Sequence, residues 1–238
     1  MLVDTHCHIH DVEIFSLDPA ETVERAKLAG VTRMIVIGTC PSDAKRAQEF
    51  AAKYDGVFWS YGYHPNEAEE ALEFFKDDKL VSIGEIGLDY HYGRENRLEQ
   101  IKRFEMMLDL AEREKLPVNF HVREAFEDFW PIVDNFRLSG AVLHSFSDSE
   151  ENLKEGLNRG MYMGVNGLAT FAKISLPPLE RMVLETDAPF LTPVPLRGKI
   201  NEPSYVKNIA DWVAAKYERQ FDEVAAVTTA NAEKLFNL

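Results

Sequence analysis

Short apolar runs alternate with amphipathic stretches along all 238 residues of the chain. Each run has the length and composition of a buried β-strand, and the stretches between runs carry apolar residues at helical spacing. The pattern predicts eight strands, at residues 2–8, 33–38, 57–62, 80–85, 117–121, 141–144, 161–165 and 182–186.

Helix signals fill most of the intervals between these runs. Pro19 begins one helix and Gly30 ends it, and Ser42 and Ser149 stand where serine N-caps are expected. The predicted helices are at residues 19–29, 42–54, 67–76, 96–115, 124–135, 149–159, 204–217 and 222–235. Only the short segment 171–179 precedes the last strand, so we expect a truncated crossover there.

Strands that alternate with helices favour a parallel sheet covered by helices. Eight such units in a chain of this size are typical of a closed barrel. We therefore predict the α/β class and a TIM-like (β/α)8 barrel with a shortened crossover between strands 7 and 8. No linker, repeat or low-complexity tract interrupts the pattern, so residues 1–238 are expected to form a single domain.

Polar residues recur at the carboxyl ends of the predicted strands, the face on which active sites of such barrels gather. They are His6, His8, His64, Glu85, His121, His144 and Asp187. A lone histidine at a strand end is usually structural. The recurrence of this placement in strand after strand predicts a functional site instead.

Glu85 stands between Gly84 and Gly87, where packing alone would favour Val or Ile. We therefore expect the fourth strand to end at Glu85 with a sharp turn of the backbone. The turn would place this carboxylate at the mouth of the barrel, as a bridge between metal ions at the centre of a hydrolytic site.

His6 and His8 are two residues apart, so both rings lie on one face of a strand and Cys7 points to the other, as a small core residue. With His121 and His144 they provide four imidazoles, beside the carboxylates of Glu85 and Asp187. This set is too large for one tetrahedral zinc ion. It suits two divalent cations bridged by Glu85 and a hydroxide, with zinc the leading candidate and manganese or magnesium as alternatives.

Other residues are candidates for proton transfer and substrate binding. Asp187 is placed to accept a proton from the attacking water, and Glu185 shares its strand face and is expected to orient a ligand.

His64 and Arg123 are candidates for binding substrate, Arg123 through a phosphate oxygen. A surface ion pair with Glu124 or Glu127 explains Arg123 equally well. The loop 197–199, Arg-Gly-Lys, is a further candidate for contacting a phosphate backbone.

The composition limits the possible partners. The chain has 26 Lys and Arg against 40 Asp and Glu, a net charge of −14. This charge argues against a protein that coats nucleic acid, but it permits local binding of phosphate by metal ions and a few arginines.

Two cysteines without a CxxC pair suit a reducing compartment. We see no leader peptide and no apolar stretch of membrane-spanning length, so we expect a cytoplasmic protein with no obligate protein partner.

In its motifs the chain resembles the TatD family of metal-dependent deoxyribonucleases, among the amidohydrolase-like barrels. The resemblance covers nearly the whole chain. It rests on DTHCH (4–8), GYHP (62–65), GEIGLDY (84–90), LPVNFHVR (116–123), HSFS (144–147), ETDAP (185–189) and RGKINEP (197–203). It implies a TIM-like barrel with His6, His8, Glu85, His121, His144 and Asp187 as metal ligands and Asp187 as general base. The implied activity is hydrolysis of DNA phosphodiesters, often as a 3′–5′ exonuclease.

Two departures from the family pattern concern the substrate. Asp148 replaces a usual glycine and adds a negative charge that opposes a polyanion, and the crossover before the last strand is short. Two-metal hydrolysis of single-stranded DNA remains the leading hypothesis. The alternative is a binuclear hydrolase of a small amide, lactone or ester. A metal-containing scaffold without turnover would show a missing ligand, and none is missing.

Overall fold

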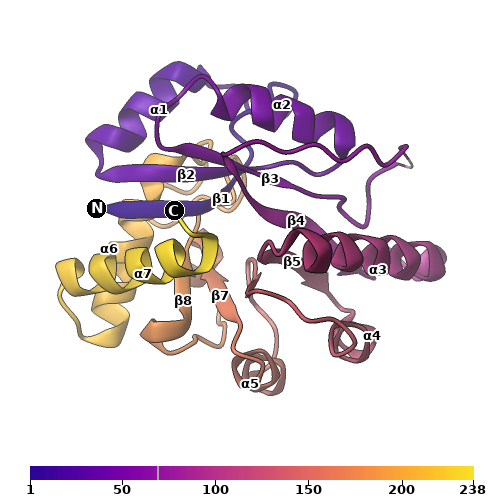
Figure 1. Cartoon of the computed structure of the whole chain (residues 1–238). Helices are drawn as coiled ribbons and strands as arrows, with labels where there is room; N and C mark the ends of the chain where they lie inside the picture. The colour runs from indigo at the N-terminus through magenta and orange to yellow at the C-terminus, as the bar shows by residue number, and fades with distance from the viewer. Residues whose placement is uncertain (69) are drawn as a thin grey trace.

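The computed structural model describes residues 1–68 and 70–238 of the chain. Its eight strands are parallel, and each pairs with the next in sequence order, β1 to β8. This arrangement confirms the predicted barrel (Figure 1). The strands are β1 (Leu2–Cys7), β2 (Val31–Ile37), β3 (Val57–Tyr61), β4 (Leu80–Asp89), β5 (Val118–Arg123), β6 (Ala141–Leu143), β7 (Tyr162–Val165) and β8 (Met182–Leu184).

The barrel is nearly closed by contacts between β1 and the chain that follows β8. The backbone N–H of Asp187 donates to the carbonyl of His6 at 2.9 Å, and that of His8 donates to the carbonyl of Ala188 at 2.8 Å. The buried carboxylate of Asp4 accepts hydrogen bonds from the backbone N–H and the hydroxyl of Thr186, at 2.9 and 2.6 Å. These bonds fix β1 against the chain that follows β8, and candidate ligands stand on both: His6 on β1 and Asp187 after β8.

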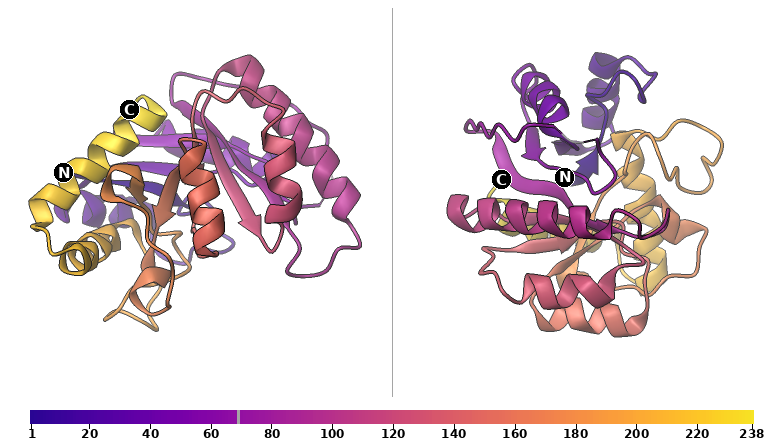
Figure 2. Two further views of the ribbon diagram at one scale, coloured as in Figure 1. Left: turned by 90° about the horizontal axis from the view of Figure 1, so that it is seen from below. Right: turned by 90° about the vertical axis from the view of Figure 1, so that its right-hand side faces the viewer.

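The helices lie outside the strands (Figure 2). They are α1 (Pro19–Leu28), α2 (Pro41–Ala51), α3 (Arg97–Glu114), α4 (Phe126–Val133), α5 (Glu150–Asn158), α6 (Val206–Tyr217) and α7 (Phe221–Phe236). Between β7 and β8, where every residue is described, the chain forms only the short 3-10 segments Gly167–Thr170 and Leu179–Arg181. The expected truncation of this crossover is confirmed.

The predicted helix at residues 67–76 is wrong for the described part of that segment; residue 69 lies outside the described residues. The described part of the segment packs on β3 without helix or strand. The hydroxyl of Tyr61 donates to the carbonyl of Glu73 at 2.9 Å, and the ring of Phe75 stacks on Trp59 with centroids 5.5 Å apart. Tyr61 therefore hydrogen-bonds a backbone carbonyl of the segment, and Trp59 packs on its apolar side chain, in place of the contacts that a helix would make.

Of the two predicted serine caps, one is confirmed and one is wrong. Ser149 accepts a hydrogen bond from the backbone N–H of Asn152 at 3.2 Å and caps α5. Helix α2 instead begins at Pro41, because the fixed backbone angle of proline suits the first helical position. Ser42 lies inside the first turn and donates to Glu70 at 2.8 Å.

Strand β4 does not end at Glu85 as expected. It continues through both glycines to Asp89, and its pairing with β5 is irregular between Ile83 and Ile86. Gly84 and Gly87 have φ angles of +156° and +150°, and β5 leaves no room for side chains there. A Cβ atom at Gly87 would lie 1.8 Å from the carbonyl oxygen of His121. The glycines therefore allow the close approach of β4 to β5, rather than a turn.

The amino ends of the strands enclose an apolar cluster that helix α7 completes. Its members include Val3, Ile35, Val81 and Val183 from the strands, and Leu235 and Phe236 from α7. Because the amino end of the barrel is apolar, the polar groups of the interior lie toward the carboxyl ends.

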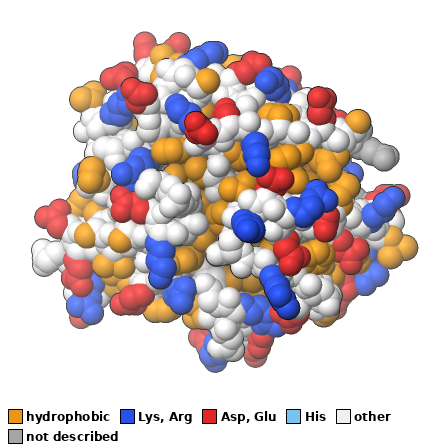
Figure 3. All heavy atoms as spheres, viewed as in Figure 1, with side chains coloured by type: hydrophobic (Ala, Val, Ile, Leu, Met, Phe, Trp, Pro, Cys, Tyr) orange, Lys and Arg blue, Asp and Glu red, His pale blue; other side chains and the backbone are white. Residues whose placement is uncertain are grey.

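On the face viewed in Figure 3, acidic and basic side chains are interspersed. None of the helices described is long and apolar enough to cross a membrane.

Candidate metal centre

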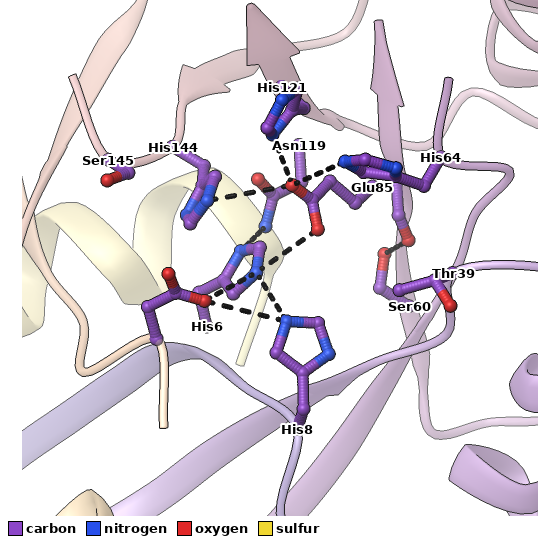
Figure 4. Close-up of polar contacts among 12 residues, drawn as sticks. His6, His8, Thr39, Ser60, His64, Glu85, Asn119, His121, His144 and Ser145 are labelled. Carbon is purple, nitrogen blue, oxygen red and sulfur yellow. Dashed lines mark hydrogen bonds and ion pairs between the residues drawn. The ribbon is translucent and has the colours of Figure 1, made fainter. Parts of the chain in front are cut away.

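Glu85 stands at the centre of a cluster of histidines contributed by four other strands or the loops that follow them (Figure 4). Its Oε1 lies 2.8 Å from Nδ1 of His121 on β5 and 3.6 Å from Nε2 of His144 after β6. Its Oε2 lies 3.5 Å from Nε2 of His6 on β1. Each oxygen thus faces a different set of imidazoles, as a bridging carboxylate requires.

His8 and Asp187 complete the cluster on the β1 side. Nε2 of His8 lies 3.2 Å from Nε2 of His6 and 3.5 Å from Oδ1 of Asp187. His6 itself is 3.7 Å from the same oxygen. All six residues predicted as metal ligands therefore meet at one place, although they come from five separate parts of the chain.

The described residues offer three overlapping groups of atoms that could hold a metal ion. One group is His6, His8 and Asp187, a second is His6, Glu85 and His144, and a third is His64, Glu85 and His121. Within each group the ligand atoms lie within 4.8 Å of one another. Because Glu85 and His6 each belong to two groups, neighbouring cations would share ligands. Imidazole and carboxylate donors of this kind suit zinc and manganese.

Two of the imidazoles have a carboxylate behind them, on the nitrogen that points away from the cluster. Nε2 of His121 lies 3.1 Å from Asp89, and Nδ1 of His144 lies 3.0 Å from Glu185. A metal-binding histidine usually donates its second ring N–H to such a group, which fixes the ring and its tautomer. The hydrogen bond of His121 to Asp89 therefore fits a metal at its inner nitrogen, whereas Nδ1 of His144 lies close to Glu185 but makes no hydrogen bond among the described residues. The geometry also places Glu185 where the sequence predicted an orienting residue.

His6 has an amide in the same position. Nδ2 of Asn119 lies 3.2 Å from Nδ1 of His6, and Oδ1 of Asn119 is buried without a hydrogen-bond partner among the described residues. A flip of this amide would place Oδ1 on Nδ1, which would then hold the ring proton. Nε2 of His6 would then present its lone pair to the cluster.

Ionisation of the cluster follows from its burial and its mixed charges. Burial disfavours the carboxylate of Glu85, but the adjacent His144 and His6 hold its pKa well below the usual range. Burial also opposes charge on the rings, yet Asp89 and Glu85 raise the pKa of His121 to about 9. Glu185 and Glu85 likewise raise the pKa of His144 to about 10. Without a cation, protons on these two rings balance the carboxylates.

His64 faces the cluster from the loop after β3. Its Nε2 is 3.9 Å from Oε1 of Glu85, and its Nδ1 accepts a hydrogen bond from the backbone N–H of Asn66 at 3.2 Å. Burial lowers the pKa of His64 to about 4, so the ring is neutral. Since Nδ1 accepts, the single ring proton is on Nε2. His64 thus presents a hydrogen-bond donor to the site.

Arg123 lies beside the cluster, in a cavity of about 200 Å³ that it lines together with His144 and Asp148. Its guanidinium lies 5.8 Å from the centre of the Tyr92 ring. Among the described residues it makes no ion pair with Glu124 or Glu127, which pair with His91 and Arg94 respectively. Arg123 is therefore free to meet an anion, with the carboxylate of Asp148 close by.

In the loop 197–199, the guanidinium of Arg197 packs against the segment that follows β7. The guanidinium of Arg197 lies 3.9 Å from the centre of the Phe171 ring and donates to the carbonyl of Thr192. Neither Arg197 nor Lys199 is among the described residues that line the cavity around Glu85. Cys7, as expected, is buried in the core on the far side of β1 from the cluster.

Sequence reasoning missed Asp89 and Asn119. Both follow the two-residue period of a strand, Asp89 four positions after Glu85 and Asn119 two positions before His121. A polar residue in register with a predicted ligand was the available signal. For Asp89 the signal was hidden because the fourth strand was expected to end at Glu85.

Comparison with known proteins places this site in a family. The family described as TatD related DNase matches residues 3–237. The chain belongs to this family. It is 38% identical to the uncharacterized metal-dependent hydrolase YabD of Bacillus subtilis, with the whole of both chains covered. The protein is thus a metal-dependent hydrolase of the TatD family.

Two further relatives bear on the fold and the activity. The chain is 36% identical to a protein of Cronobacter turicensis named 3′-5′ ssDNA/RNA exonuclease TatD, and the match covers 93% of each chain. The crystal structure of the TatD homologue YjjV from Escherichia coli K12 superposes with a TM-score of 0.87 at 28% identity. That match covers 100% of this chain and 98% of the other, so the barrel is that of the TatD family.

Proposed function

We propose that this TatD family member removes nucleotides from the 3′ end of single-stranded DNA, with two divalent cations, zinc foremost, held by the Glu85 cluster. The observation that carries the proposal is the position of Glu85, whose two oxygens face separate sets of imidazoles. The name of the Cronobacter relative supports a nucleic-acid substrate.

The proposed ligands divide into two sets that share Glu85. His6, His8 and Asp187 form one set, and His121 and His144, which both face Oε1 of Glu85, form the other. When bound, two cations would lower the pKa of a water molecule and withdraw charge from the phosphoryl oxygens. The work of the protein is to fix the ligands, through Asp89, Glu185 and Asn119, and to hold the substrate.

Asp187 is the proposed acceptor of the proton from the attacking water. Burial raises the pKa of this carboxyl group, but the hydrogen bond from His8 and the charges of the nearby rings lower it below the ordinary value. Asp187 is therefore ionised at neutral pH. It lines the cavity of about 360 Å³ that contains Glu85, so it can reach a water placed there.

His64 and Arg123 are the proposed substrate-binding residues. The Nε2–H of His64 donates toward the space beside Glu85, which suits a phosphoryl oxygen of the scissile bond. Arg123 lines a neighbouring cavity that shares His144 with the cavity of the cluster, and it suits the neighbouring phosphate of the strand. The two residues would thus align the strand across the cluster.

The substitution Asp187→Asn tests the proposed general base. We expect it to reduce turnover of single-stranded DNA by about 10²-fold or more while the fold, measured by circular dichroism, is kept. Asp109→Asn, on the exposed face of α3, is the matched control and should retain activity. Full turnover in Asp187→Asn would remove Asp187 from the mechanism.

A hydrolase of a small amide, lactone or ester is the second candidate. Acidic residues favour it: Asp11 and Glu67 line the cavity around Glu85, and Asp148 lines the cavity of Arg123. These carboxylates oppose a polyanion but not a neutral substrate. Parallel assays on single-stranded DNA and on simple esters and lactones separate the two candidates, since only one class should turn over efficiently.

A further inference from the structure

Two apolar side chains are part of the lining of the cavity around Glu85. Ile14, from the loop after β1, and Phe190, from the loop after β8, line this cavity together with the metal cluster. Phe190 is 50% exposed and Ile14 is 44% exposed, whereas the adjacent Phe15 is only 2% exposed. The chain therefore leaves an aromatic and an aliphatic side chain open to solvent at the mouth of a polar site.

The backbone of Phe190 is held firmly next to the cluster. Its N–H donates to the carbonyl of Asp187 at 2.8 Å, and its carbonyl accepts from the side-chain amide of Asn201 at 2.5 Å. The centre of its ring lies 6.5 Å from that of His8. The ring thus has a defined place relative to the ligands, which is what an aromatic platform for a ligand requires.

The charges around the cavity differ from one side to the other. Asp11 and Glu67 line the same mouth as Phe190, whereas Arg123 lines a neighbouring cavity that shares His144 and also contains Glu124 and Asp148. The carboxylates beside Phe190 repel a phosphate, and Arg123 gives the neighbouring cavity a cation that can pair with one. A substrate that crosses the cluster should therefore place an uncharged, flat group on Phe190.

We propose that Phe190 and Ile14 form a subsite for the terminal nucleobase of a single strand. This inference rests on the proposed nuclease function and adds the part of the substrate that these apolar side chains receive. Aromatic side chains bind bases by stacking, with little dependence on sequence. The carboxylates of Asp11 and Glu67 can accept hydrogen bonds from amino groups of the base. A terminal base that is paired in a duplex has its pairing edge and its inner face occupied, so the subsite favours an unpaired end.

The test compares two oligonucleotides with the zinc-loaded protein. One ends in an ordinary 3′ nucleotide and the other in an abasic residue. We expect the wild type to prefer the ordinary end by about tenfold in kcat/KM, and Phe190→Ala to lose this preference. Phe190→Tyr should keep it. Phe171→Ala is the matched control, because Phe171 is also an exposed ring but does not line this cavity.

Binding of product-like ligands separates the subsite from catalysis. Calorimetry would compare deoxyadenosine 5′-monophosphate with deoxyribose 5-phosphate on wild type and Phe190→Ala. A base-dependent affinity that Phe190→Ala abolishes supports the subsite even if no oligonucleotide is cleaved, in which case the nuclease function alone fails. Cleavage without any preference for a terminal base in the wild type overturns the subsite and leaves the nuclease function intact. Equal losses on both oligonucleotides in Phe190→Ala also overturn it.

Discussion

Nδ1 of His121 lies 2.8 Å from Glu85, and Nε2 of the same ring lies 3.1 Å from Asp89, so one imidazole is held between two carboxylates. The arrangement follows from the glycines of β4. Glu85, Gly87 and Asp89 alternate along one strand face, and the missing side chain at Gly87 lets His121 come close. Its chemical consequence is a strong affinity of the site for positive charge, whether protons or metal.

Metal binding should therefore release protons. The raised pKa values of His121 and His144, about 9 and about 10, mean that both rings are protonated at pH 7.5 without a cation. A metal takes the lone pair that a proton held, so we expect release of about one to two protons per protein chain. The apparent affinity for zinc should rise with pH up to that range. Calorimetry in buffers with different ionisation enthalpies measures the release. Zinc binding without any proton release would contradict this account.

Asn119→Leu should weaken metal binding without unfolding the protein. Leucine has nearly the shape of asparagine, but it removes the polar group beside Nδ1 of His6. We expect the dissociation constant for zinc to rise by about 10-fold or more. A competition titration with a chelator measures it, and an unchanged constant would show that Asn119 does not orient His6.

Asp43 should make the stability of the metal-free protein depend on acid pH. This buried carboxylate accepts from Nε2 of His10 at 3.0 Å and from the backbone N–H of Thr39 at 2.9 Å. Burial raises its pKa, but these partners outweigh burial and lower it to about 2. The folded pKa lies below the unfolded one, so the stabilisation is complete above about pH 4 and is lost as pH falls toward 2.

The shift corresponds to about 2 kcal/mol of unfolding free energy. Asp43→Asn should lose this part of the pH dependence between pH 4 and pH 2, measured by urea unfolding against wild type. Parallel stability curves for the two proteins would show that the Asp43 pair contributes nothing.

The barrel was predictable because its pattern is local and repeated. Each strand is a short apolar run, and the polar residue that follows it marks the carboxyl end, so the sequence placed His6, His121 and His144 on one face. The spatial meeting of these residues is then a consequence of parallel strands in chain order. The same sequence pattern therefore predicted both the fold and the candidate ligands.

The errors arose where long-range contacts override local pattern. The amphipathic segment 67–76 is not helical in its described part, because Tyr61 and Trp59 on β3 hold it by hydrogen bonding and stacking. The length of β4 depends on its close approach to β5, which Gly84 and Gly87 permit and no local propensity reveals. The same misplaced strand end concealed Asp89.

The central claim is that the Glu85 cluster hydrolyses DNA from the 3′ end. The most direct measurement is the degradation of 5′-labelled and 3′-labelled single-stranded DNA by metal-reconstituted protein, beside Glu85→Ala. We predict a ladder that shortens from the 3′ end of the 5′-labelled strand, early release of the 3′ label as a mononucleotide, and loss of both in the variant. Absence of cleavage with zinc, manganese or magnesium, by wild-type protein that holds two metal ions, would contradict the account and favour a small-molecule substrate.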